Sequence, residues 1–459
     1  MSPNTSTLTS ISISMVSASK PPIALIFALI FAGSLRAQAP APLRLSFADA
    51  VRQATGNTQS APPSVVIAGL RTDAASARVR QTRSGLLPSL SLSGGWLSRN
   101  FNTQAQGLSF SGIPKIIGPF DAYDGRVRVT QTLFDFANMG RVSAAKSQAS
   151  AAGADRSAVI EASAQNVALA YARGARAQAV VNARQADSAL AAELVGLAVA
   201  QQQAGVSASI DVTRARTQLA EAAGRLIVAS NQLDRARIDL ARALGIDPAT
   251  PITLADTLNA QLGAADVPAD RSAAVAQGVA VRPDLAAELA RGAAARTAAS
   301  AISSERLPRL ELEADYGLSG VALASALSTR QVAVQVTLPI LDGFRREGRL
   351  AEQQAVVRES DVRARDLREQ VSADVDGALL DLRSAVAQQM IATERLQLAA
   401  EEVSQARQRF KAGVAGNIEV ITAQESLLRA RDADIDARFA AVSARIALAR
   451  SVGSARTLH

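Results

Sequence analysis

The chain has 459 residues, no cysteine, a single histidine (His459) and a formal net charge of +8. Without cysteine there is no disulfide, no thiolate nucleophile and no lipid-bearing thiol, and without a placed histidine the usual transition-metal and Ser-His chemistries lose their groups. The sequence also has no phosphate-binding glycine loop, no nucleophile elbow and no HExxH pattern, so we expect no enzyme, no catalytic residues, no cofactor and no metal site.

The positive charge is spread along the chain. Arginines alternate with acids, as between Arg358 and Asp366, which is the pattern of a solvated helix face with salt bridges. Aromatic residues make up only 3% of the chain and do not lie among the basic residues, so no platform for stacking bases is visible. We therefore expect no nucleic-acid partner, although the pI is near 10.5.

Residues 1–39 are predicted to be a signal peptide. Lys20 precedes an apolar run from Ile23 to Ala32, and Ala37-Gln38-Ala39 then supplies small residues at the spacing that signal peptidase prefers. The polar stretch before Lys20 is long, so Met15 is an alternative start. A membrane anchor is the other interpretation, but the apolar run is well short of the roughly 18 to 20 residues that a spanning helix needs.

After the leader, the sequence predicts a short helix, two strands and two helices of unequal length. The short helix covers residues 65–86 and ends before Leu87-Pro88-Ser89-Leu90, where leucines begin to alternate with serines; a second alternating strand covers residues 127–133. The proline-free stretch 140–203 predicts a helix roughly 95 Å long at 1.5 Å per residue. A tight turn then leads into a helix about half as long over residues 209–244.

The rest of the chain repeats this order, with most landmarks displaced by 208 residues. Gln203-Ala204-Gly205-Val206 recurs as Lys411-Ala412-Gly413-Val414, and Leu87-Pro88-Ser89-Leu90 recurs at 307–310, displaced by 220, so the loop that follows must be longer in the first copy. The second copy has its short helix at 283–306, strands at 310–316 and 332–340, and helices at 348–411 and 417–452. The predicted organisation is a first repeat over residues 40–245, an equatorial linker over 246–272, a second repeat over 273–453 and a short C-terminal tail over 454–459.

Each strand has an apolar and a polar side. In the clearest case, Val332, Val334, Val336, Leu338 and Ile340 alternate with small or polar residues. Each run has about the ten-residue length of a tilted membrane strand, whereas a soluble sheet with one buried face is the alternative. Four strands leave an open sheet, and the smallest closed membrane barrels have about eight, so a barrel would require several chains.

The helices carry regular seven-residue seams that are rich in alanine. Val212, Leu219, Leu226, Leu233 and Leu240 recur every seven residues, with alanines three places behind them. A strict seven-residue repeat predicts a left-handed coiled coil, and the alanines predict close approach of the helices. A soluble two-stranded coiled coil would explain the seams but not the strands.

Four motifs, in order, are similar to those of the TolC-type outer membrane efflux proteins, and the resemblance covers nearly everything after the leader. Leu45-Ser46-Phe47-Ala48-Asp49-Ala50-Val51 looks like the opening helix of the family, and Leu87-Pro88-Ser89-Leu90 like the entry into its first strand. Arg282-Pro283-Asp284-Leu285 resembles a family hallmark, with Pro283 in a first helical turn. Leu338-Pro339-Ile340-Leu341-Asp342-Gly343, followed by Gly348-Arg349, looks like the exit from the last strand into the long helix.

The resemblance implies a mainly α chain with a small β part, in which duplicated long helical hairpins form part of an α-barrel across the periplasm. Three chains would make a homotrimer and contribute four strands each to a twelve-stranded transmembrane β-barrel in the outer membrane of a diderm bacterium. The implied function is a duct that passes small molecules, such as drugs, metals and other toxic solutes, or proteins from an inner-membrane pump to the exterior. A periplasmic adaptor protein would join pump and duct, and specificity for the substrate would reside mostly in the pump.

The resemblance also implies candidate residues for the tips and for the gate. The adaptor-contacting tips would comprise Gln203, Ala204, Gly205, Val206, Ser207, Lys411, Ala412, Gly413, Val414 and Ala415. Pump-linked members of the family often have arginine where this chain has Gln203 and Lys411. The gate of the family has acids in a pattern like D-x-x-D after the second tip, where this chain has Glu419 and Thr422.

Two interpretations of Glu419 remain open. Three copies of this acid around an axis would repel one another, raise one another's pKa and attract cations. Alternatively, Glu419 is an exposed first-turn acid favoured by the helix dipole, with Asp211 as its counterpart in the first copy.

A structural or adhesive periplasmic coiled-coil protein with a soluble β domain is the alternative to a duct, and a secreted hydrolase is a more distant one. A duct would fractionate with the outer membrane as a trimer, whereas the alternatives would behave as soluble periplasmic or secreted proteins.

Overall fold

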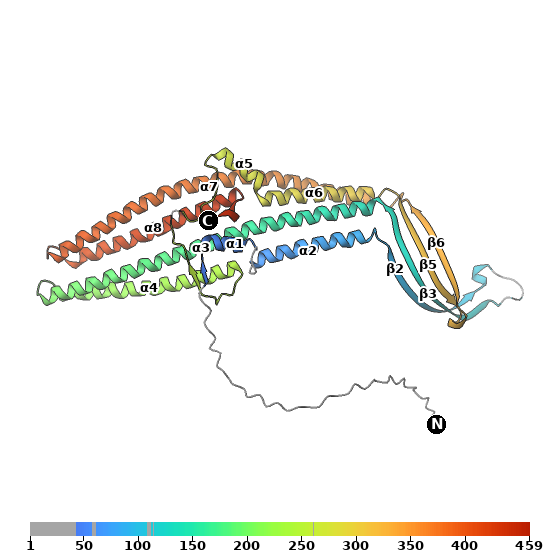
Figure 1. The fold of residues 1–459 in the computed structure, drawn as a ribbon, viewed down its shortest axis with the longest axis horizontal. Helices are drawn as coiled ribbons and strands as arrows, with labels where there is room; N and C mark the ends of the chain where they lie inside the picture. The colour runs from blue at the N-terminus through green and yellow to red at the C-terminus, as the bar shows by residue number, and fades with distance from the viewer. Residues whose placement is uncertain (1–42, 57–60, 108–111, 113, 260) are drawn as a thin grey trace, which may run out of the picture. The chain divides into compact units, whose positions relative to one another are not determined.

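The computed structural model describes residues 43–56, 61–107, 112, 114–259 and 261–459. The signal peptide predicted for residues 1–39 lies outside these residues. The helices are α1 (Phe47–Ala54), α2 (Pro63–Ser84), α3 (Phe136–Gln203), α4 (Ser209–Leu244), α5 (Arg271–Val281), α6 (Pro283–Ser304), α7 (Arg345–Lys411) and α8 (Asn417–Ser451) (Figure 1). The strands are β1 (Leu43–Leu45), β2 (Ser89–Asn102), β3 (Ile116–Asp135), β4 (Ile252–Leu254), β5 (Arg309–Gly320) and β6 (Leu327–Thr337).

The predicted order of elements occurs twice, as α2-β2-β3-α3-α4 and as α6-β5-β6-α7-α8. The loop that the displacement of 220 predicts to be longer in the first copy is longer there: residues 103–115 join β2 to β3, whereas residues 321–326 join β5 to β6. The strands have 14, 20, 12 and 11 residues, so three of them exceed the expected ten by more than one residue.

The predicted last strand, over residues 332–340, is wrong at its end. β6 begins earlier, at Leu327, and ends at Thr337, so Leu338 and Ile340 lie outside it. Pro339 has no N–H group to donate to a strand ladder, which accounts for the end of the strand.

Proline and acidic caps fix several helix starts. Pro63 and Pro283 occupy the first turns of α2 and α6, where a missing N–H costs no hydrogen bond. Asp135 caps α3, because its side chain accepts a hydrogen bond from the Asn138 N–H at 3.0 Å. Asp135 is also the last residue of β3, so α3 follows β3 directly.

The four longer strands form one antiparallel sheet in the order β2-β3-β5-β6, with β2 and β6 at the edges. The register places Leu90, Val129, Ala314 and Val332 side by side across the sheet, which confirms the predicted apolar face. Leu90, Leu92, Val332, Val334 and Val336 of this face are exposed in the single chain.

The opposite face of the sheet is polar and carries ion pairs between β3 and β5. Arg126 lies 2.8 Å from Asp315, and Arg128 lies 3.0 Å from Glu313. Among the described residues, none of the helices combines the length and the apolar character that crossing a bilayer requires.

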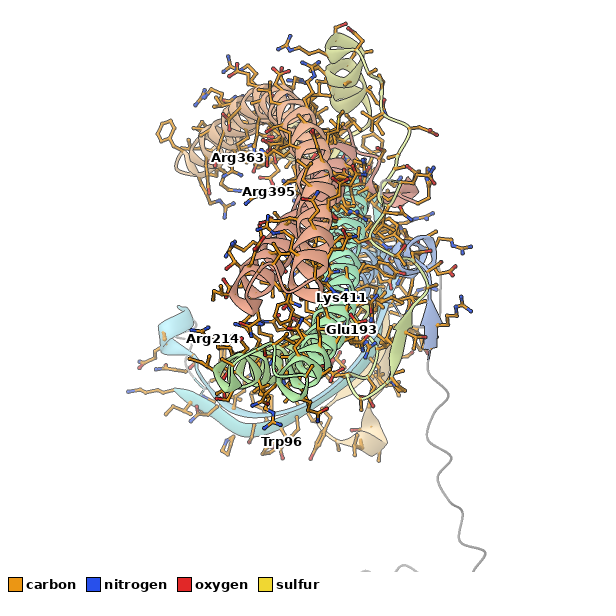
Figure 2. All side chains as sticks on the ribbon, turned by 90° about the vertical axis from the view of Figure 1, so that its left-hand side faces the viewer. Trp96, Glu193, Arg214, Arg363, Arg395 and Lys411 are labelled. Carbon is orange, nitrogen blue, oxygen red and sulfur yellow. The ribbon has the colours of Figure 1, made fainter. Side chains whose placement is uncertain are left out.

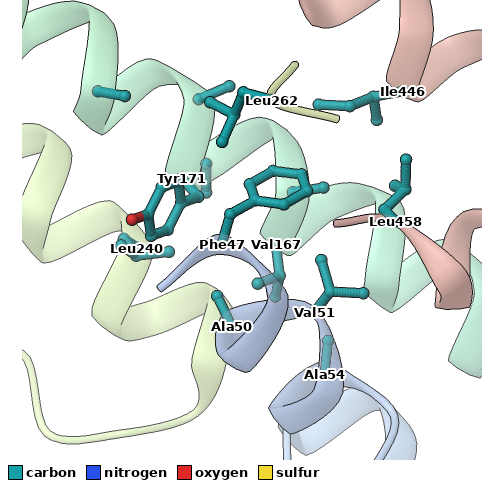
Figure 3. Packing of buried hydrophobic residues seen from close by; sticks show 14 of the residues in the cluster. Phe47, Ala50, Val51, Ala54, Val167, Tyr171, Leu240, Leu262, Ile446 and Leu458 are labelled. Carbon is teal, nitrogen blue, oxygen red and sulfur yellow. The ribbon is translucent and has the colours of Figure 1, made fainter. Parts of the chain in front are cut away.

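The main core lies where α1 packs against the middle of α3. Phe47 and Tyr171 meet edge to face, with ring centroids 5.5 Å apart, among side chains of α4, α8 and the linker (Figure 3). The Tyr171 O–H donates to the Leu45 carbonyl at 3.0 Å, and burial raises the pKa of this phenol to about 12. The predicted linker contributes to the same core through β4, which pairs in parallel with β1, and through Leu258 and Leu262.

The residues predicted to be a short tail also pack into this core. Ala455 is fully buried, and Leu458 is almost so. The Ala455 N–H donates to the buried carboxylate of Glu161 at 2.6 Å, and Arg456 Nε lies 3.0 Å from the other carboxylate oxygen of Glu161. Backbone bonds between His459 and residues 263–264 complete the attachment.

The alanine-rich seams pack as the heptads predict. α3 pairs with α4 and α7 pairs with α8, and buried seam residues on α4 include Val212, Ala222, Leu233 and Leu240. α3 also contacts α1, α2, α6 and α8, whereas α7 contacts α5 and α6 in addition to α8.

Candidate functional site

Two tight turns form the ends of the helical hairpins, as predicted. Gly205 has φ +76° and Gly413 has φ +70°, the left-handed region that glycine adopts without strain. The following residue closes each turn, because the Val206 N–H donates to Gln201 O and the Val414 N–H donates to Arg409 O, both at 3.0 Å. Among the described residues, a Cβ at either glycine would meet no atom within 4 Å, so a substitution there strains only the backbone.

The predicted tip residues are mostly exposed. Ser207 and Ala415 are half-buried, and the other eight residues are open to solvent. Each tip also displays an apolar side chain in the first turn of the following helix, Ile210 in α4 and Ile418 in α8. Both are exposed, like Val206 and Val414. Sequence reasoning missed these two isoleucines as site residues, although the repeat itself placed them at equivalent positions.

Polar contacts join the two tips. Gln201 Nε2 donates to Phe410 O at 2.7 Å, and Asn417 Nδ2 donates to Asp211 O at 2.7 Å. Asn417 is fully buried, whereas its counterpart in the first copy, Ser209, is exposed. The two tips are therefore not equivalent. The first residue of α8 bonds to the backbone of α4, whereas the first residue of α4 is exposed to solvent.

The gate candidates lie in the first two turns of α8. Glu419 is paired with Arg409 of α7, whose Nε lies 3.1 Å from Glu419 Oε1, and both side chains remain substantially exposed. Thr422 is exposed, and its hydroxyl donates to Ile418 O at 2.9 Å within the helix. Arg409 therefore offsets the charge of Glu419 within the single chain.

Side chains of the hairpins and of the sheet project in different directions. In Figure 2, Arg214, Arg363 and Arg395 lie along one side of the helices, whereas Trp96 projects from the sheet on another side. Near the first tip, Glu193 of α3 pairs with Arg407 of α7 at 2.7 Å. The described surface thus combines long polar helices with one exposed apolar sheet face. This arrangement suits a protein whose strands contact the lipid of a bilayer.

The sequence profile of the family described as "Outer membrane efflux protein" matches residues 56–246 and 276–454. The chain belongs to this family. Both matched segments fall on the two structural repeats described above. Membership implies a trimeric channel that works in a tripartite system.

Individual relatives are more distant. Protein CyaE of Bordetella pertussis is 27% identical over 366 residues, which cover 79% of this chain and 75% of the relative. The pyoverdine export outer membrane protein OpmQ of Pseudomonas putida is 25% identical over 267 residues, or 57% of this chain and 55% of that protein.

Solved structures share the fold at low identity. CusC has a TM-score of 0.74 and 18% identity, covering 89% of this chain and 92% of that one. The CmeC outer membrane channel of Campylobacter jejuni has a TM-score of 0.75 and 17% identity, covering 89% and 86%. The open MtrE channel of Neisseria gonorrhoeae has a TM-score of 0.71 and 19% identity, covering 89% and 88%.

These findings confirm the predicted fold class, with long paired helices and a four-stranded antiparallel sheet in a TolC-like arrangement. The protein is an outer membrane efflux channel that extends into the periplasm, and it is a transport protein rather than an enzyme. The adhesive coiled-coil protein and the secreted hydrolase are therefore set aside.

Proposed function

We propose that three copies of this chain form a homotrimeric duct that carries small molecules or proteins from an inner-membrane pump to the cell exterior. The observation that carries the proposal is the sheet, which has one exposed apolar face and whose edge strands, β2 and β6, each pair with only one other strand of the described chain. Unpaired backbone groups are not tolerated in lipid, so the edges must find partners there. Pairing β6 of each copy with β2 of the next would close a twelve-stranded barrel.

The leader over residues 1–39 would direct the chain through the inner membrane and be removed. The repeats over 40–245 and 273–453, the linker over 246–272 and the tail over 454–459 would then form one protomer. The name of OpmQ refers to pyoverdine export, which supports a small-molecule substrate, and drugs, metals, other toxic solutes and proteins are the remaining classes.

The trimer is tested by membrane fractionation and by mass measurement in detergent. We expect the protein in the outer membrane fraction, with a detergent-corrected mass of three chains. A soluble periplasmic monomer would rule the duct out.

The two tips would bind a periplasmic adaptor protein that connects the duct to the pump. Their exposed valine and isoleucine pairs, Val206 with Ile210 and Val414 with Ile418, give each tip a small apolar surface of the kind that a partner helix can cover. Replacing Gly205 and Gly413 with leucine should impair export while the trimer remains folded. Export at the normal rate from such a trimer would count against tip docking.

Glu419 and Thr422 would lie at the pore entrance. Glu419→Ala should change single-channel conductance and cation block in planar bilayers, and Arg409→Gln should change them in the opposite direction, because it leaves the acid without its partner. Identical conductance in both variants and in the natural protein would exclude a pore-lining role.

A further inference from the structure

A groove lies between α2 and the first half of α3. It consists of two cavities of about 540 and 690 Å³, which share Ala75, Arg78 and Gln148 as lining residues. We call the two together the α2–α3 groove. Its floor is apolar and made of small side chains: Ala68, Ala74, Ala75, Ala145, Ala152, Ala158, Val159 and Ala162.

The lining of the groove carries an excess of positive charge. Its basic residues are Arg71 and Arg78 of α2, Arg141 and Arg156 of α3, and Arg291 of α6. Asp155 is the one acid among the described lining residues, and it pairs with Arg291. Arg141 lies 3.8 Å from Glu305. In the part of the chain that the structure describes, Arg71, Arg78 and Arg156 form no ion pair.

These three guanidinium groups lie along the same stretch of the two helices. A Cβ built at Gly69 would lie 3.9 Å from Arg156 Nε, so the Arg156 side chain reaches from α3 to the backbone of α2. Arg71 and Arg78 are about two helical turns, or roughly 10 Å, apart on one side of α2. Like charges along a concave surface raise the local potential and attract counter-ions. Guanidinium groups also match the oxygens of carboxylates and phosphates with paired N–H donors.

The second repeat does not have this chemistry. Displacement by 220 residues converts α2 into α6, and displacement by 208 converts α3 into α7. Arg78 and Arg156 correspond in this way to Ala298 and Ala364. Arg71 does have an arginine as its counterpart, but that arginine pairs with a buried carboxylate at 2.6 Å. The excess charge is therefore a property of the first repeat and does not follow from the architecture that the two repeats share.

The groove lies on the side of α3 that α1 does not cover. Ala162 in the groove precedes Tyr171 in the main core by about two and a half turns, so the two side chains leave α3 in opposite directions. α1, the linker and the C-terminal residues pack on the Tyr171 side. A duct must keep its lumen clear. In the proposed trimer this packed layer would therefore lie outside the wall, and the groove would open to the lumen.

We propose that the α2–α3 groove binds an amphipathic organic anion in transit. The acid group pairs with Arg71, Arg78 and Arg156, and the apolar body covers the alanine floor. The proposal rests on the duct proposed above and names the class of solute that the duct carries. The groove has the size and lining of a small-molecule site, which is typically a cavity of roughly 300 to 1,000 Å³ with apolar walls and a few polar groups.

Binding is tested with 1-naphthalenesulfonate and the full-length protein in a nonionic detergent, by isothermal titration calorimetry. Replacing Arg71 and Arg78 together with glutamine, which we call the groove variant, should weaken binding by about tenfold or more, because it removes charged hydrogen-bond donors. Methanesulfonate lacks the apolar body and 1-naphthylmethylammonium has the opposite charge. Both should bind the natural protein more weakly than the probe, again by about tenfold or more.

Arg80→Gln with Arg83→Gln is the matched control, since it removes the same charge from the same helix. Position 80 lies about 200° around α2 from position 78, and position 83 about 140°, so neither side chain points into the groove. The control variant should bind the probe as the natural protein does. Circular dichroism and the mass in detergent establish that both variants are folded. Arg156→Gln, on the other wall, should weaken binding in the same direction if the groove variant does not fold.

Equal affinity of the probe for the natural protein, the groove variant and the control would overturn the site, as would equal binding of the naphthyl cation. The position in the lumen is tested in planar bilayers. The probe should reduce the current through the natural channel and the control, and leave the groove variant unaffected. Binding without any effect on the current would refute transit through the groove. A monomeric protein that still binds the probe would refute the duct and leave the anion site standing.

Discussion

α3 and α7 are the same element used twice, with 68 and 67 residues, yet the chain surrounds them differently. α3 is covered by helices on most sides and holds buried polar residues, among them Glu161 and Arg184. Their counterparts on α7 are the exposed Glu369 and the buried Ala392. The comparison teaches that the seven-residue repeat determines which side of a helix packs against its hairpin partner. The residue types and the burial of the other sides depend on neighbouring helices, which the repeat does not specify.

The largest difference should appear at Tyr171. Tyr171→Ala removes a buried ring and its hydroxyl from the core, which should lower the free energy of unfolding by about 3 to 5 kcal/mol. The counterpart change on α7, Leu379→Ala, alters a half-buried side chain and should cost clearly less. Urea unfolding followed by circular dichroism measures both, and equal costs would show that the two helices are covered alike.

The two equivalent glutamates should differ almost as much. Glu161→Ala leaves Arg456 and the Ala455 N–H without their buried partner, which should cost about 3 kcal/mol. Glu369→Ala changes an exposed side chain and should stay within about 0.5 kcal/mol. The same unfolding experiment gives both values; a neutral Glu161 variant would mean that the C-terminal residues contribute little to the core.

The starts of α2 and α6 should respond differently to acid. At α6, burial acts to raise the pKa of Asp284, but hydrogen bonds and charge from Arg282 outweigh it and lower that pKa to about 2. Since the pKa is lower in the folded chain than the usual value of about 3.9, the carboxylate stabilises the fold above pH 4. This contribution, about 2 kcal/mol, is lost as the pH falls from about 4 to 2.

The first repeat has Pro62 and Ser64 where the second has Arg282 and Asp284, so α2 has no such dependence. Asp284→Asn should therefore flatten the stability profile between pH 4 and 2, and Ser64→Ala should leave its slope unchanged. If the unfolding free energy of the Asp284 variant still fell with pH as steeply as that of the natural protein, Asp284 would not be the source of the pH dependence.

The smallest effect should come from the exposed ion pair between Arg176 of α3 and Asp436 of α8. In a double-mutant cycle, Arg176→Gln and Asp436→Asn should couple by about 0.2 to 1 kcal/mol, and added salt should reduce the coupling. A coupling that added salt leaves unchanged would contradict an exposed ion pair.

Local signals in the sequence predicted most of the helices and both tips. Proline marks the starts of α2 and α6, glycine marks Gly205 and Gly413, and the alanine heptads identify the faces that meet within each hairpin. These features act over a few residues, so the sequence displays them directly.

Contacts between distant segments could not be predicted in this way. The pairing of Glu419 with Arg409, the burial of Asn417 and the ion pairs of Arg184 depend on which helices lie side by side, and no local pattern specifies that. The packing of Leu458 into the core was missed for the same reason, because a short segment without periodicity resembles a tail until its neighbours are known.

The direct junction of β3 and α3 makes the first hairpin a rigid mechanical link. One continuous helix of roughly 100 Å runs from the sheet to the tip, with no loop that could absorb a twist. In the second repeat, residues 338–344 separate β6 from α7, and this segment ends at Phe344 with φ +63°. A torque applied at the tips would therefore reach the strands through an unbroken helix in the first repeat, and through the non-helical residues 338–344 in the second.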